Sequence, residues 1–84
     1  MIDNKKECQR LHARRRAMDR YGLWLSNSDI DNIVRMINAG KVRFIETETR
    51  ERAVFVICYK KTICKVAYDK QMNNICSFLP MKQR

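Results

Sequence analysis

The feature that most constrains the fold is a change in hydrophobic periodicity at Gly40. Before this glycine, apolar residues recur at the i, i+3, i+4 and i+7 positions of a helix. The clearest such set is Ile30, Ile33, Val34 and Ile37. After it, β-branched and aromatic residues alternate or run together in short segments separated by polar turns. The chain is therefore expected to form helices first and a β-sheet second.

Two helices are predicted, over residues 4–21 and 26–39. In the first helix, the apolar residues that share one face are Cys8, Leu11, Met18 and Tyr21. In the second helix, Ser26 is the predicted N-cap, and Leu25 and Ile30 occupy the positions of a hydrophobic staple. Each helix is followed by a glycine, which is typical of a helix end.

Four strands are predicted between residues 41 and 80, at 41–48, 53–59, 62–68 and 75–79. Short connections favour an antiparallel meander. The expected fold is one α+β domain over residues 1–84, with the order ααββββ and both helices packed on one face of the four-stranded sheet. A two-residue turn at Lys60-Lys61 would put Lys65 on the opposite face, which would be open and mostly apolar.

The charge balance is strongly basic, because 18 Lys and Arg residues face nine Asp and Glu residues, for a formal net charge of +9 over 84 residues. Such a charge attracts polyanions. We expect a nucleic-acid partner, while an acidic protein partner or a merely soluble surface remain alternatives. The candidate contacts are cations of the first helix and of the predicted sheet: Arg14, Arg15, Arg16, Arg20, Lys60, Lys61 and Lys65.

Other classes of protein are not indicated. The longest apolar run is too short for a membrane span, and the N-terminal residues lack a secretory signal. The four cysteines lack Cys-x2-Cys spacing and there is one histidine, so neither a metal nor another cofactor is expected. We interpret all four cysteines as reduced packing residues of a cytoplasmic protein.

Two residues of the first helix have more than one interpretation. Arg15 falls inside the apolar face, so its stem could pack while its head reaches solvent or pairs with Asp19. Alternatively, Arg15 grips a phosphate with its planar guanidinium group. His12 is either a surface residue or a general acid and base, the role for which histidine is the usual choice.

Several short motifs carry a resemblance to a known group of proteins. They are His12-x-x-Arg15-Arg16, Tyr21-Gly22, Val66-Ala67-Tyr68-Asp69-Lys70 and Ser77-Phe78-Leu79-Pro80. From about residue 5 to 80, the chain resembles small phage and prophage proteins that look like distant relatives of RelE-type toxins, in the barnase–EndoU–colicin–RelE group. The chain departs from that group in lacking a dense terminal cluster of Arg, His and Tyr after Pro80.

The resemblance implies two helices on a four-stranded antiparallel sheet, metal-independent cleavage of RNA, and a possible antitoxin partner. In such an endoribonuclease His12 would be the acid and base, Arg15 and Lys65 would stabilise charge, and Tyr68 would stack or assist. Tyr68 is otherwise a packing residue. We expect binding without catalysis, to a nucleic acid (RNA before DNA) or to a host nucleoprotein. The alternatives are a RelE-like ribonuclease and a protein-binding or structural domain.

Overall fold

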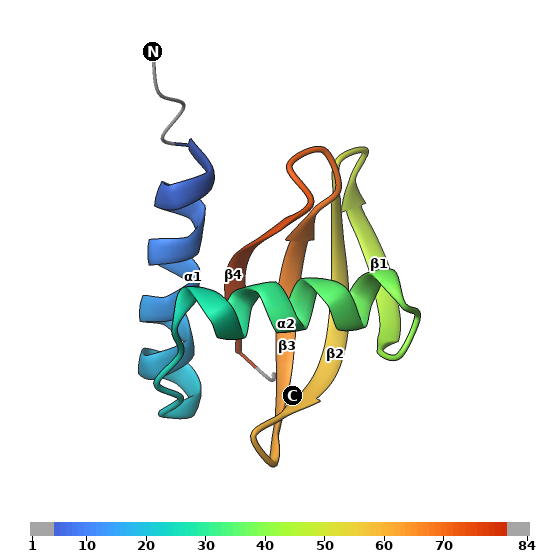
Figure 1. Ribbon diagram of the computed structural model, residues 1–84. Coiled ribbons are helices and arrows are strands. Elements are labelled where there is room, and N and C mark those ends of the chain that lie inside the picture. The colour runs from blue at the N-terminus through green and yellow to red at the C-terminus, as the bar shows by residue number, and fades with distance from the viewer. Residues whose placement is uncertain (1–4, 81–84) are drawn as a thin grey trace.

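The computed structural model describes residues 5–80 and has the predicted ααββββ order. The elements are α1 (Lys5–Tyr21), α2 (Asn27–Asn38), β1 (Arg43–Thr49), β2 (Arg52–Tyr59), β3 (Thr62–Asp69) and β4 (Asn74–Leu79). The strands form one antiparallel sheet in the order β1-β2-β3-β4. Helix α2 crosses one face of this sheet, and α1 lies alongside β4 (Figure 1). The α+β fold is confirmed; residue 4, where the first helix was predicted to start, lies outside the described residues.

Helix α2 begins as predicted, at an N-cap formed by Ser26. The Ser26 hydroxyl accepts a hydrogen bond from the Asp29 backbone N–H at 3.2 Å, and the Asp29 carboxylate accepts one from the Ser26 N–H at 2.9 Å. Leu25 and Ile30, the two residues of the predicted staple, are both buried. The cap and staple fix the direction in which the chain enters α2.

Helix α1 presents a different face to the core from the one predicted. The fully buried residues are Ala13 and Ala17, whereas Leu11 and Met18 are 44% and 41% exposed and Cys8 is also exposed. The prediction was wrong for these three residues. The physical reason is that α1 approaches β4 closely, and small side chains at i and i+4 permit that approach.

A polar network around Asn74 adds to the contact between α1 and β4. The Asn74 side chain, which is fully buried, donates hydrogen bonds to the Lys6 carbonyl at 3.1 Å and the Gln9 side chain at 3.0 Å. Its oxygen accepts one from Arg10 Nε at 3.0 Å, and Arg10 also pairs with Asp31 of α2 at 2.6 Å. These bonds satisfy the buried amide and fix α1 against both β4 and α2.

The sheet has the two faces that the sequence predicts. Strand pairing sets Ile57 opposite Cys64 on the face beneath α2, and Val56 opposite Lys65 on the other face. We call the face away from α2 the outer face. The Lys60-Lys61 turn joins β2 to β3 with φ angles of +51° and +64°, the left-handed conformation that a two-residue hairpin requires and that is more often taken by Asn or Gly.

All four cysteines are free thiols, two of them buried and two exposed. Cys64 and Cys76 are buried, as predicted, whereas Cys8 and Cys58 are exposed, so their assignment as packing residues was wrong. Cys58 is exposed because its position in β2 places it on the outer face, opposite Ile63.

Within residues 5–80, no helix is long and apolar enough to cross a membrane, and no group of three potential metal-ligating side chains is found.

Candidate nucleic-acid interface

One row of residues on the outer face brings cations from different strands together. The register sets Arg43 opposite Val56, Val56 opposite Lys65, and Lys65 opposite Leu79. Residues paired in this way point to the same side of a sheet, and neighbouring strands are about 4.8 Å apart. Arg43 and Lys65 therefore start from backbone positions about 10 Å apart on the same surface.

Helix α1 adds a third cation at the end of this row. Nη1 of Arg20 donates a 2.8 Å hydrogen bond to the Phe78 carbonyl of β4, one residue before Leu79. The neighbouring Tyr21 hydroxyl accepts a bond from the Lys65 N–H at 3.1 Å and donates to the Leu79 carbonyl. We call Arg20, Lys65 and Arg43 the cationic row.

The positive charges of the row are free to attract an anionic ligand. Neither Arg43 nor Lys65 has an ion-pair partner in the part of the chain that the structure describes, and the same holds for Arg20. Apolar side chains lie among them on the outer face: Val56 and Leu79 are half-buried, and Ile63 is 58% exposed. Val54 and Ala67, which pair on the same face, are buried, so the predicted open face is found only in part, around Val56, Ile63 and Lys65.

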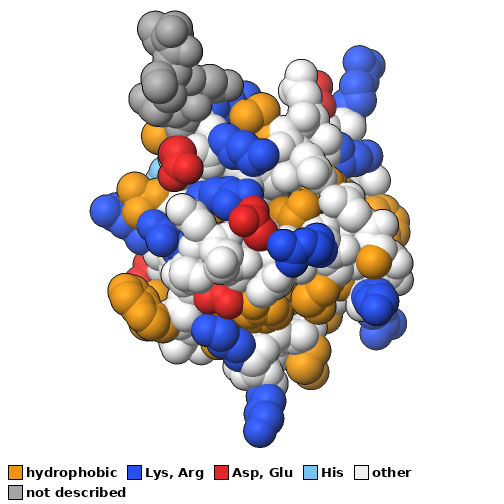
Figure 2. Space-filling model, in the orientation of Figure 1, with side chains coloured by type: hydrophobic (Ala, Val, Ile, Leu, Met, Phe, Trp, Pro, Cys, Tyr) orange, Lys and Arg blue, Asp and Glu red, His pale blue; other side chains and the backbone are white. Residues whose placement is uncertain are grey.

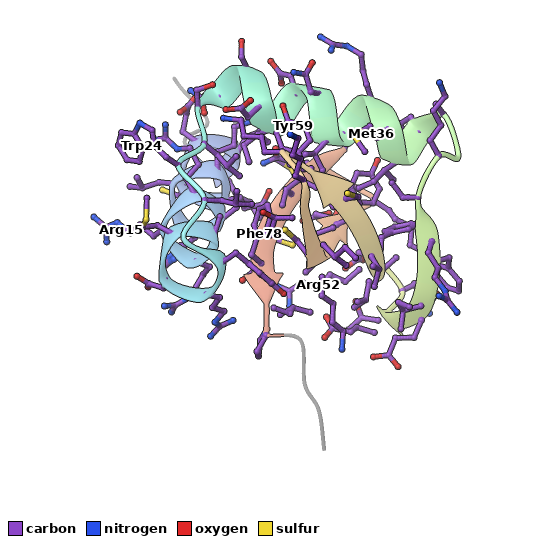
Figure 3. The ribbon with its side chains drawn as sticks, turned by 90° about the horizontal axis from the view of Figure 1, so that it is seen from below. Arg15, Trp24, Met36, Arg52, Tyr59 and Phe78 are labelled. Atoms are coloured by element: carbon purple, nitrogen blue, oxygen red, sulfur yellow. The ribbon has the colours of Figure 1, made fainter. Side chains whose placement is uncertain are left out.

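Arg52 is a further cation on the outer face, away from the row. Figure 3 shows it on the side of the sheet opposite α2. Its guanidinium group lies beside the Cys76 thiol, whose pKa is raised mainly by burial, and 3.7 Å from Glu48. An exposed ion pair at this distance is weak and leaves most of the charge of Arg52 free to act on a ligand.

The three consecutive arginines of α1 do not join the row. Arg15 points away from the sheet, on the far side of α1 (Figure 3), and Arg14 lines the same side of the helix. Arg16 lies 3.6 Å from Asp19, so the carboxylate that was considered for Arg15 pairs with Arg16 instead. The basic run therefore divides between different surfaces.

The two lysines of the β2–β3 turn are also apart from the row. Lys60 Nζ lies 3.3 Å from the Trp24 carbonyl and 3.4 Å from the Asp29 carboxylate, so it ties the turn to the start of α2. Lys61 is exposed at the tip of the turn. On the face that α2 covers, Lys and Arg side chains are dispersed among carboxylates and apolar side chains (Figure 2).

Tyr68 lies on the face of the sheet beneath α2. It is 7% exposed, and its hydroxyl forms hydrogen bonds with the side chains of Asn73 and Asn38. Its ring packs edge-on against Phe55, and burial raises the pKa of its hydroxyl. Tyr68 is thus a packing residue, which was one of its two interpretations.

The four residues considered for catalysis are not brought to one place. Lys65 is on the outer face, whereas Tyr68, three residues further along the same strand, is buried on the opposite face. Arg15 points away from the sheet, and His12 is exposed on α1. The arrangement gathers cations but does not place an acid, a base and a charge-stabilising group around one reacting atom.

Sequence reasoning included Lys65 and Arg20 but missed Arg43, Arg52 and Trp24. Arg43 could be placed only through the register of β1 against β2, which includes a bulge after Phe44. Trp24 had a readable signal, since it stands alone between two leucines in a segment without helical periodicity.

The chain matches no protein-family model, no curated protein and no solved structure.

Proposed function

We propose that this protein binds single-stranded nucleic acid across the outer face of its sheet, without cleaving it. The observation that carries the proposal is the cationic row, in which Lys65 and Arg43 share the outer face and Arg20 of α1 lies at the β4 edge of the sheet. A strand laid across the sheet along this row passes three positive charges in sequence. The net charge of +9 adds long-range attraction to any phosphate backbone.

The chemistry of the outer face favours an unpaired strand over a duplex. Val56, Ile63 and Leu79 present apolar surface beside the cations, and exposed bases can cover such surface only when they are not paired with another strand. The aromatic rings of Phe55 and Tyr68 lie on the other face, so base stacking is not available from them. We expect modest affinity with little sequence preference, and the choice of RNA over DNA rests on the RelE-like resemblance.

Lys65 gives the first test of this proposal. Lys65→Ala should weaken binding of a fluorescein-labelled uridine oligonucleotide about tenfold, because a charged contact to phosphate is worth about 1.4 kcal/mol. The matched control is Lys41→Ala, which removes an equal charge from the exposed segment after α2. Fluorescence anisotropy at fixed salt measures both, and an equal loss in the two variants would contradict a defined site.

Catalysis is tested separately by incubating the purified protein with total RNA in EDTA. We expect the RNA to stay intact, because the four candidate catalytic residues are dispersed. Cleavage that persists in EDTA and disappears in His12→Ala would contradict this and support the RelE-like ribonuclease. The variant must keep the thermal midpoint of the wild type for the comparison to hold.

A further inference from the structure

A hollow on the far side of α1 has no role in the proposed function. It has a volume of about 350 Å³ and lies between α1 and the loop that leads to α2. Its lining residues are Leu11, Arg14, Arg15, Met18, Asp19 and Trp24. We call it the Trp24 hollow, and Figure 3 shows Arg15 and Trp24 on this side of α1, away from the sheet.

The fold holds Trp24 out in solvent. Its neighbours Leu23 and Leu25 are 7% and 5% exposed, whereas Trp24 is 80% exposed. The Leu23 N–H donates to the Ala17 carbonyl at 3.2 Å, and Lys60 Nζ donates to the carbonyl of Trp24 itself at 3.3 Å. The backbone that carries the indole is thus held on both sides, so contact with a partner costs mainly the side-chain freedom of Trp24.

The lining of the hollow has the composition of a protein-binding surface. Leu11 and Met18 are two turns apart on α1, and both face solvent instead of the core. Together with Trp24 they are half of the large hydrophobic residues that are exposed in the part of the chain the structure describes. Tryptophan, methionine and arginine are enriched at interfaces, and a concentrated apolar patch commonly marks one.

The charge of the hollow is not balanced by this chain. Arg14 and Arg15 have no ion-pair partner within residues 5–80, and the one carboxylate that lines the hollow, Asp19, is shared with Arg16 at 3.6 Å, so two positive charges face one negative charge. Nε of Arg14 is buried and has no hydrogen-bond partner among the described residues. Because this nitrogen is shielded from solvent, an anionic ligand would reach Arg14 through its terminal guanidinium nitrogens.

We infer that the Trp24 hollow docks an acidic segment of another protein. Such a segment places one or two large apolar side chains against Leu11, Met18 and Trp24, and its carboxylates reach Arg14 and Arg15. Charge complementarity selects this occupant over a second copy of the chain, because two copies each carrying +9 repel one another. Leu11 and Met18 add aliphatic surface that apolar peptide side chains can cover, whereas a base could stack on the Trp24 ring alone, so a nucleic acid is the competing occupant in the test.

The chain supplies its own reporter for the test, because Trp24 is its single tryptophan. The probe is a helical peptide of about 16 residues, with leucine at the i, i+3, i+4 and i+7 positions and glutamate elsewhere. Its binding should shift the tryptophan emission to shorter wavelength in a saturable way. The comparison probes are the same peptide with lysine replacing glutamate, and a uridine oligonucleotide.

Substitutions then locate the contact. Arg14→Gln combined with Arg15→Gln should weaken peptide binding at least tenfold, and Leu11→Ser should weaken it similarly. The matched control combines Arg35→Gln in α2 with Lys41→Gln just after it, which removes the same amount of charge from another surface. Lys65→Ala should leave peptide binding unchanged. Each variant is checked for an unaltered circular dichroism spectrum and thermal midpoint.

The proposal is overturned if the glutamate peptide gives no emission shift at millimolar concentration. It is also overturned if the lysine peptide binds equally well, or if the control pair weakens binding as much as the hollow pair. A response to the oligonucleotide alone would assign the hollow to nucleic acid instead. A spectrum that changes with protein concentration in the absence of peptide would assign it to self-association.

Discussion

Asp29 is the residue at which the start of α2, the loop before it and the β2–β3 turn meet. Its carboxylate accepts hydrogen bonds from the Tyr59 hydroxyl at 2.7 Å and the Ser26 N–H at 2.9 Å, and Lys60 lies 3.4 Å away. The bond from Tyr59 is the largest cause that lowers the pKa of Asp29 to about 2. Folding therefore favours the ionised carboxylate.

This lowered pKa predicts a pH dependence of stability. The contribution of Asp29 is complete above about pH 4 and is lost as the pH falls from there toward 2, because the unfolded chain takes up the proton first. Asp29→Asn should lower the free energy of unfolding by about 1–2 kcal/mol at neutral pH and flatten the decline between pH 4 and 2. Thermal unfolding followed by circular dichroism from pH 2 to 7 measures both effects.

The exposed Asp19→Asn serves as the control for this experiment. Its side chain is 63% exposed and 3.6 Å from its partner Arg16, so the substitution should change the thermal midpoint very little. If Asp29→Asn and Asp19→Asn behave alike across the pH range, the capping network does not stabilise the fold as described.

At the scale of the elements, the sequence predicted the boundaries to within two residues. It predicted the buried face of α1 incorrectly. Helix α2 and the strands were readable because Ser26, Gly40 and the alternation of β-branched residues are local signals. The buried face of α1 was not readable from apolar periodicity, which gives the greatest weight to Leu11 and Met18. Alanine contributes little to such a pattern, yet Ala13 and Ala17 are the residues of α1 that are fully buried.

The identity of the buried face of α1 can be tested by enlarging a buried side chain and, separately, shortening an exposed one. Ala17→Leu should lower the free energy of unfolding by about 1–3 kcal/mol, because three added carbons have no space where Ala17 is fully buried. Leu11→Ala should cost less than about 1 kcal/mol, because that side chain faces solvent. Urea unfolding of both variants measures this, and the reverse order would mean that the predicted face is the buried one.

For the whole molecule, the central result is how the positive charge is distributed. The sequence shows an excess of cations but not which of them meet, because that depends on the pairing of β1 with β2 and on where α1 crosses the end of β4. Arg20 and Lys65, 45 positions apart, converge for this reason, while Arg14 and Arg15 face the other way. The structure thus separates a cationic row on the sheet from an apolar, arginine-lined hollow on α1.

The salt dependence of oligonucleotide binding tests the cationic row most directly. The dissociation constant for a uridine oligonucleotide is measured at several salt concentrations for Arg43→Ala combined with Lys65→Ala, and for the control pair Arg35→Ala with Lys41→Ala. If both row residues contact phosphates, the slope of log K against log salt should become shallower by about 1.4 in the row pair, at about 0.7 per lost contact. The control pair should keep the slope of the wild type. Equal slopes in the two pairs would show that binding depends on overall charge alone and would contradict a defined site on the outer face.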